Sequence, residues 1–186
     1  MVKETQPAEH DLVEQVQTGS RSAFDRLVTP LVPQLLTLAR RMLGSASEAE
    51  DAVQSALASV WVARTKLDPE RPPVAFLTTV TLNKCRDALR RRKAARFFGF
   101  AGNDFDLDLA ADEPDAGVVA ADRQALETVQ QAMERLPVRL REALVLVSME
   151  GMSQREAAEV LGVTEKAVET RVYRARARLR ENFDGF

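Results

Sequence analysis

The last part of the chain carries small, basic and hydrogen-bonding residues at a spacing suited to contact with nucleic acid. In "SQREAAEVLGVTEKAVETRVYRARARLR", Ser153 and Glu156 form a capping-box pattern at the start of one helix. Gly162 falls at a turn, where a left-handed backbone costs glycine least. Ala158 and Val168 are apolar at positions where two crossing helices would touch. The spacing predicts a helix-turn-helix, whose second helix enters the major groove of DNA.

Side chains at the start of such a recognition helix reach base edges, and nearby arginines contact phosphates. We therefore expect a set of DNA-contacting residues in this motif: Arg155, Thr164, Glu165, Lys166, Glu169, Thr170, Arg171 and Arg174. Thr164 can also cap the second helix. The alternative is a small helical bundle with a solvated, arginine-rich tail. The combined spacing of Ala158, Gly162 and Val168 makes this the weaker interpretation.

Charge is unevenly distributed along the chain. The segment Lys84–Arg96 holds seven basic residues and the single acid Asp87. Residues 97–122 include seven acids and no base, and a second basic run, "RVYRARARLR", starts at Arg171. This pattern predicts two surfaces for a polyanion, although the net charge of the whole chain is only -2.

A further set of polar residues lies on a segment whose apolar residues have helical spacing. Glu48, Asp51 and Gln54 fall within two helical turns, with Glu48 and Asp51 at i and i+3. Carboxylates at this spacing face the same side of a helix, so they can contact a basic partner helix together. The alternative is an ordinary solvated acidic face.

These residues must be positioned by helices, because apolar residues recur at helical spacing through most of the chain. Pro30 and Pro33 should interrupt the first long apolar stripe, and Gly44 is a suitable residue to end it. Ser47–Glu50 matches a capping box for the next helix. No alternating apolar and polar pattern predicts a strand.

The elements group into two domains. Pro73 can begin a helix that runs to about Lys93, after which glycines, proline and acids replace the helical pattern. Helical spacing then resumes. We expect an all-α fold of two small helical domains, 1–95 and 121–186, joined by a flexible acidic linker over 96–120 that contains phenylalanines.

The remaining composition limits the classes of function. Cys85 is the only cysteine and His10 the only histidine, so an intramolecular disulfide is impossible and a cysteine-type metal site lacks ligands. No phosphate-binding loop, catalytic triad or metal-ligand spacing is present, so we expect no enzyme activity, cofactor or metal. The chain shows no apolar run of membrane-spanning length and no signal-peptide character at "MVKETQPAEHD". We expect a cytoplasmic protein with no membrane insertion.

Two sets of motifs together resemble bacterial RNA polymerase sigma factors of the extracytoplasmic-function type, group 4 of the sigma-70 family. The first set is "SAFDRLVTPLVPQLLTLARRMLG", "AEDAVQSALASVW" and "AFLTTVTLNKCRDALRRRK", and the second runs from "LPVRLREALVLVSMEG" through the helix-turn-helix. The resemblance covers Leu12–Lys93 and Leu126–Leu179. It implies that the first domain is sigma region 2, which binds core RNA polymerase and the melted -10 promoter element. The second domain would be sigma region 4, which reads the duplex -35 element, and the linker would pass through the core.

The resemblance also implies a role for each residue set. The core-binding set, which would contact a coiled coil of the largest core subunit, is Glu48, Asp51 and Gln54. The -10 set is Asn83, Lys84, Arg86, Arg90 and Arg91. The -35 set is the group of helix-turn-helix residues named above. Asn83 would read an extruded base through its amide, while the basic residues attract phosphates. Ser55 departs from the family pattern, where an acid is common, and an anti-sigma factor is an expected partner.

One other class of protein fits part of this pattern. A two-domain helix-turn-helix regulator that acts without core polymerase would need the second motif set, but not "AEDAVQ" or "TLNKCRDALRRRK". A separate hypothesis concerns the linker. Phe97, Phe98 or Phe100 could dock against one of the domains and favour a closed, inactive arrangement.

Overall fold

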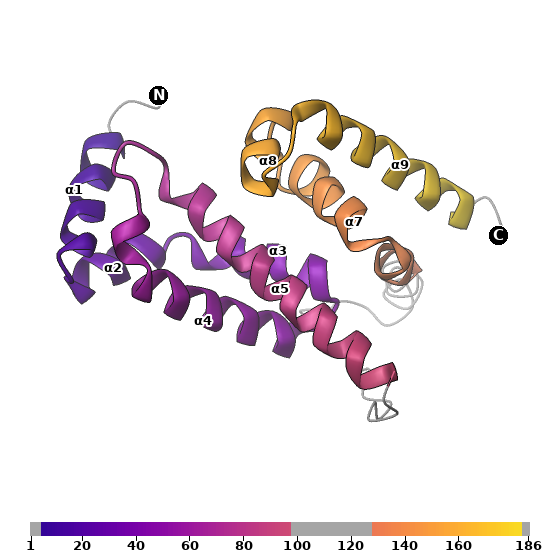
Figure 1. The fold of residues 1–186 in the computed structure, drawn as a ribbon, viewed down its shortest axis with the longest axis horizontal. Helices are drawn as coiled ribbons and strands as arrows, with labels where there is room; N and C mark the ends of the chain where they lie inside the picture. The colour runs from indigo at the N-terminus through magenta and orange to yellow at the C-terminus, as the bar shows by residue number, and fades with distance from the viewer. Residues whose placement is uncertain (1–4, 98–127, 184–186) are drawn as a thin grey trace, which may run out of the picture.

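The computed structural model describes residues 5–97 and 128–183, and most of them are helical (Figure 1). Within these ranges there is no β-strand, so the all-α prediction is confirmed there. In the part of the chain that the structure describes, each helix is too short or too polar to cross a membrane. The expected domain boundaries at 120 and 121 lie outside the described residues.

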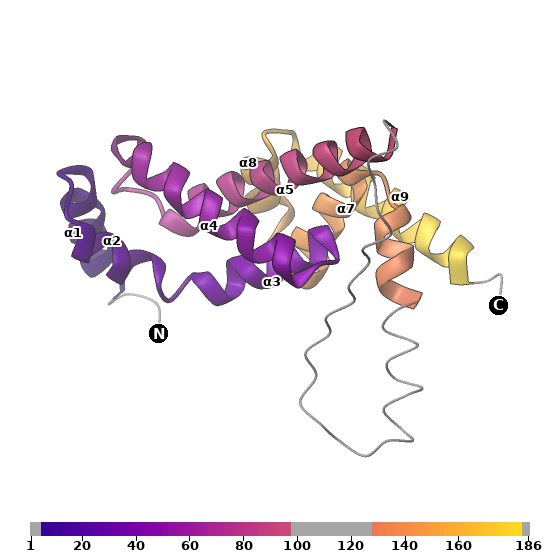
Figure 2. The ribbon, with the colours of Figure 1, turned by 90° about the horizontal axis from the view of Figure 1, so that it is seen from below.

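The N-terminal helices, residues 5–97, form a bundle in which α3, α4 and α5 all pack against one another. Their bounds are α1 Thr5–Gln17, α2 Arg21–Val28, α3 Val32–Leu43, α4 Ala46–Val62, the 3-10 turn η1 Arg64–Lys66 and α5 Pro73–Phe97. Helices α1 and α2 pack together at one end of the bundle (Figures 1 and 2). This arrangement places α5 along the outside of the bundle, with a long side available to other parts of the molecule.

Local signals account for most helix ends in this bundle. The chain breaks between α2 and α3 at Pro30, as the prolines predict, and Gly44 ends α3 with a left-handed φ of 74°. The capping box expected at Ser47–Glu50 is wrong. Ser45 is the N-cap of α4, and its side chain accepts a hydrogen bond from the Glu48 N–H. Helix α5 continues to Phe97, beyond the expected end, because alanines and arginines sustain the helix.

The C-terminal helices, residues 128–183, contain the predicted helix-turn-helix. A helical segment over 128–135 precedes α7 Val138–Leu144, the π-helical turn η2 Val145–Met149, α8 Gln154–Leu161 and α9 Glu165–Phe183. Both bonds of the Ser153–Glu156 capping box are present, and Gly162 ends α8 with φ 64°. The Ala167 N–H donates to Thr164 Oγ1 at 3.2 Å, so Thr164 caps α9 as expected.

The two groups of helices pack against each other. Helix α5 contacts α8, and α3 contacts the π-helical turn η2 (Figures 1 and 2). Leu43 of α3 and Leu146 of η2 belong to one continuous cluster of buried apolar side chains. Phe97, at the end of α5, is 84% exposed, and the hypothesis that a linker phenylalanine docks against a domain stays a prediction. Phe98 and Phe100 lie outside the described residues.

Candidate nucleic-acid and polymerase interfaces

Helix α9 presents the -35 set on the side opposite its packing stripe. Val168, Val172 and Ala175 are buried at i, i+4 and i+7, and they hold α9 against α7 and α8. The polar members of the helix face outward: Glu165, Lys166, Glu169 and Arg174 are exposed, and Thr170 and Arg171 are half-buried. The structure therefore places all the expected α9 residues at the surface of the motif.

Two members of the -35 set lie before α9. Arg155 of α8 is exposed and forms an ion pair with Glu159 at 3.6 Å. The Thr164 side chain is exposed at the α9 cap. Tyr173 is not in the predicted -35 set, although its side chain is 69% exposed on the same helix, between Arg171 and Arg174. An aromatic residue on the polar flank of a recognition helix is the signal that could have identified it.

The -10 set lies on α5, but its members differ in how far other side chains engage them. Asn83 is exposed, and its Oδ1 accepts a hydrogen bond from Arg86 Nη1 at 2.7 Å. Arg90 and Arg91 are exposed, Arg90 forms an ion pair with Asp87, and Lys84 is half-buried. Among these residues only Arg86 reaches the C-terminal helices within the described structure.

Arg86 forms a two-pronged ion pair with Glu142 of α7. Its Nε donates to Oε1 at 2.5 Å, and its Nη2 donates to Oε2 at 3.0 Å. The Glu142 side chain is only 2% exposed, whereas Arg86 keeps one third of its surface in solvent. The hydrogen bonds to Glu142 raise the pKa of Arg86 above its ordinary value. Burial raises the pKa of the neighbouring Cys85 thiol to about 12, which keeps it protonated and unreactive.

The core-binding set lines a groove that also holds part of the -10 set. Asp51 and Gln54 of α4 are exposed, and Glu48 is half-buried. Lys84, Arg90 and Arg91 of α5 form the opposite wall. One groove therefore combines an acidic wall on α4 with a basic wall on α5.

Glu48 is not available as a simple surface carboxylate. It forms an ion pair with Arg92, whose guanidinium also donates to the Leu43 carbonyl at 3.0 Å. Burial is the largest influence on Arg92 and lowers its pKa from the ordinary value. Asp51 and Gln54 are therefore the members of this set best placed to meet a partner directly.

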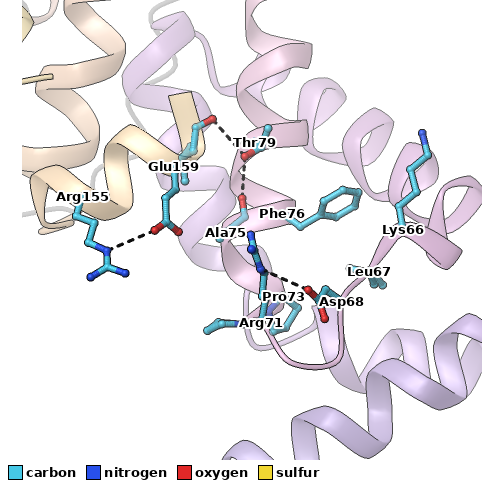
Figure 3. Close-up of a pocket in the computed structure, with 12 residues that line it drawn as sticks. Lys66, Leu67, Asp68, Arg71, Pro73, Ala75, Phe76, Thr79, Arg155 and Glu159 are labelled. Carbon is cyan, nitrogen blue, oxygen red and sulfur yellow. Dashed lines mark hydrogen bonds and ion pairs between the residues drawn. The ribbon is translucent and has the colours of Figure 1, made fainter. Parts of the chain in front are cut away.

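A second hollow lies where the two groups of helices meet. It is a cleft of about 570 Å³, lined by Phe76, Thr79 and the turn before α5 on one side. Arg155, Glu159 and Val160 of α8 line the other side (Figure 3). The Thr79 hydroxyl donates to the Val160 carbonyl at 3.4 Å, so a hydrogen bond joins the two groups of helices at this cleft.

One cluster on α1 has atoms that could ligate a metal. His10, Asp11 and Glu14 each bring one ligand atom within 4.8 Å of the others. Both carboxylates are exposed, and His10 Nε2 already lies 3.2 Å from Glu70 Oε1. Such solvated clusters are common on helix surfaces, and we assign no metal role to this one.

Comparisons with known proteins match both groups of helices. A family model described as Sigma-70 region 2 matches residues 27–95, and one described as Sigma-70, region 4 matches residues 126–179. RNA polymerase sigma factor CnrH of Cupriavidus metallidurans is 39% identical over 176 residues, which cover 92% of each chain. ECF RNA polymerase sigma factor SigM of Mycobacterium tuberculosis is 36% identical, covering 87% of this chain and 77% of SigM.

Two solved structures extend the match to the arrangement of the helices. The structure of CnrH in complex with the cytosolic domain of CnrY aligns with a TM-score of 0.70 and 34% identity, covering 96% of this chain and 98% of that chain. The sigma factor RpoE in complex with the anti-sigma factor NepR from Bartonella quintana aligns with a TM-score of 0.66 and 25% identity, covering 87% and 96%. The chain is thus similar to these proteins through both groups of helices.

Proposed function

This chain belongs to the sigma-70 family of RNA polymerase sigma factors, within the extracytoplasmic-function type, and we propose on that premise how its surfaces divide the work. It binds core RNA polymerase and directs promoter-specific initiation of transcription. The observation that carries this proposal is the presence of regions 2 and 4 in order on one chain. It acts in the cytoplasm by binding alone and carries out no catalysis of its own.

Region 4 reads the -35 element as duplex DNA through the exposed face of α9. Arg171 is placed to contact a base edge and Arg174 to contact a phosphate. Lys166 and Glu169 form an ion pair with each other at 2.7 Å, and a contact of either side chain with DNA can replace it. The exposed Tyr173 adds an apolar surface on the same helix. We assign region 4 to residues 121–186.

Region 2 binds the melted -10 element through α5 and core polymerase through α4. Asn83 offers both a donor and an acceptor for the edge of an extruded base. Arg90 and Arg91 attract the phosphates of the same strand. Asp51 and Gln54 face the partner helix of the core. We assign region 2 to residues 1–95 and the linker to 96–120.

An anti-sigma factor controls this activity. Support comes from the two aligned structures, in which CnrH is held by CnrY and RpoE by NepR. Region 2 and region 4 of this chain pack together closely enough that one partner can contact both at once.

The test is promoter-specific initiation in a defined system. Core RNA polymerase and the purified chain are mixed with a random promoter library, and the open complexes are isolated and sequenced. We expect enrichment of paired -10 and -35 sequences only when both proteins are present. If the chain alone binds duplex DNA tightly and core adds nothing, the protein is instead a regulator that acts without core polymerase.

A further inference from the structure

We propose that region 4 inhibits region 2 within the same molecule, with Glu142 holding Arg86 in the place of promoter DNA. This inference rests on the proposed function, because it gives α5 its role at the -10 element. It adds that the chain regulates itself before any partner binds.

The Arg86–Glu142 pair has the geometry of a specific lock. Two parallel hydrogen bonds join the guanidinium to the carboxylate, the arrangement by which arginine also grips phosphate. The Glu142 carboxylate is 2% exposed, so it must remain paired as long as the two regions are packed together. Arg86 cannot offer the same two N–H groups to a phosphate and to Glu142 at once.

Further contacts hold the same closed arrangement around this pair. Arg41 of α3 donates to Glu150 Oε1 at 2.6 Å, and the Glu150 side chain is 7% exposed. Arg141 of α7 donates to the Met42 carbonyl at 2.6 Å, which satisfies a backbone group at the end of α3. Buried apolar side chains from both regions also pack into one cluster, so the closed arrangement is a packed interface with specific hydrogen bonds.

Closure affects the two DNA-reading surfaces unequally. The α9 face remains exposed, whereas α5 gives one of its arginines to region 4. A protein in this state can present its -35 set but not its complete -10 set. The apparent affinity for the -10 element is then reduced by the fraction of molecules that are open. Opening exchanges the carboxylate of Glu142 for the phosphates of the promoter.

The first test measures closure directly. Fluorophores are placed on V62C and Y173C, where both native side chains are exposed, at 78% and 69%. The buried Cys85, with its raised pKa, does not compete for labelling. We expect Glu142→Gln to lower energy transfer in the full chain without DNA or core. The matched control is Glu181→Gln, which removes the same charge from region 4 at an exposed position near the end of α9.

Two additional variants keep this test decisive. If Glu142→Gln loses its helical circular dichroism, Glu150→Gln removes the other buried carboxylate of the interface and should also lower energy transfer. The reversed pair, Arg86→Glu with Glu142→Arg, should recover much of the lost transfer because the ion pair is re-formed. Unchanged transfer in folded Glu142→Gln, or no recovery in the reversed pair, would overturn the lock.

The second test connects closure to initiation. With core polymerase and the promoter obtained from the library, Glu142→Gln should reach half-maximal open complex at a concentration roughly ten-fold lower than the wild type. Glu181→Gln should match the wild type. Equal titrations for wild type and Glu142→Gln would refute self-inhibition while leaving the sigma function intact. No promoter-specific complex with any variant would refute the proposed function instead, whatever the energy transfer shows.

Discussion

The two helices that we propose to read DNA, α9 and α5, differ in how far their exposed surfaces depend on other parts of the molecule. Helix α9 packs through a stripe of buried apolar residues and leaves its polar face to solvent within its own motif. Helix α5 packs against α3 and α4 and also against region 4. The reading surface of α9 is therefore complete wherever region 4 is folded, while that of α5 depends on where region 4 lies.

The same contrast appears in the charges. Three basic residues of α5 are engaged by acids: Arg86 by Glu142, Arg90 by Asp87 and Arg92 by Glu48. Within the described residues, Arg171 and Arg174 of α9 form no ion pair. Whether a basic helix is available to a polyanion therefore depends on which acids pair with its bases, and these acids can lie far away in the chain.

The largest effect should come from breaking the contact between the regions at its buried cation. Arg141 is 4% exposed and donates to the carbonyls of Met42, Glu134 and Leu136. Arg141→Ala leaves these carbonyls without their donor and creates a cavity, so we expect a loss of about 3 kcal/mol in the free energy of unfolding. Urea denaturation measures it. The exposed Arg139→Ala should change stability by less than about 0.5 kcal/mol, and an equal loss in both would contradict the role of Arg141.

A second substitution compares the two reading surfaces on DNA. Arg171→Ala should cost roughly 1–3 kcal/mol at one -35 position if the side chain reads a base edge. Asn83→Ala should relax selection at one -10 base and leave core binding unchanged. Binding of holoenzyme to single-base variants of the promoter measures both. A loss that is uniform over all sequences would make the residue concerned a phosphate contact.

Two glycines with left-handed backbones allow the contact between the regions to be tested separately from the helix-turn-helix. Gly44 and Gly162 both have positive φ, but a Cβ on Gly44 would clash with the Glu134 side chain, and one on Gly162 would meet nothing within 4 Å. Both Gly→Ala variants pay a backbone cost of about 1 kcal/mol. Gly44→Ala should in addition lower energy transfer between the labelled regions, because Glu134 must move. The same transfer in both variants would show that Glu134 adapts without opening the interface.

The smallest effect is confined to region 4. Hydrogen bonds from Ser153 lower the pKa of Glu156, so the capping box is at full strength above the ordinary carboxyl pKa and is lost as the pH falls through the lowered one. Ser153→Ala should raise the pKa of Glu156 toward its ordinary value, as followed by NMR titration. It should leave the pairing of Arg86 unchanged. If Ser153→Ala also changed the energy transfer between the labelled regions, α9 and α5 would be less independent than their packing indicates.

Much of the fold could be predicted because its signals are short-range. The capping box at Ser153, the turn at Gly162 and the break at Pro30 each depend on a few neighbouring residues. The errors were also local. Ser45 rather than Ser47 caps α4, since serine at either position satisfies the pattern and only the backbone decides between them.

The candidate sites likewise have a part that follows from short-range sequence signals and a part that follows from long-range packing. The sequence by itself determined the helices and the helix-turn-helix, because periodicity and caps act over one or two turns, and the residue sets of the two proposed reading surfaces stay predictions. Only the tertiary structure decided that Arg86 meets Glu142, 56 residues away, and that Arg41 meets Glu150. Such pairs follow from how the two groups of helices pack against each other. A carboxylate that looks solvated in the sequence can then become the buried partner of an arginine expected to bind DNA.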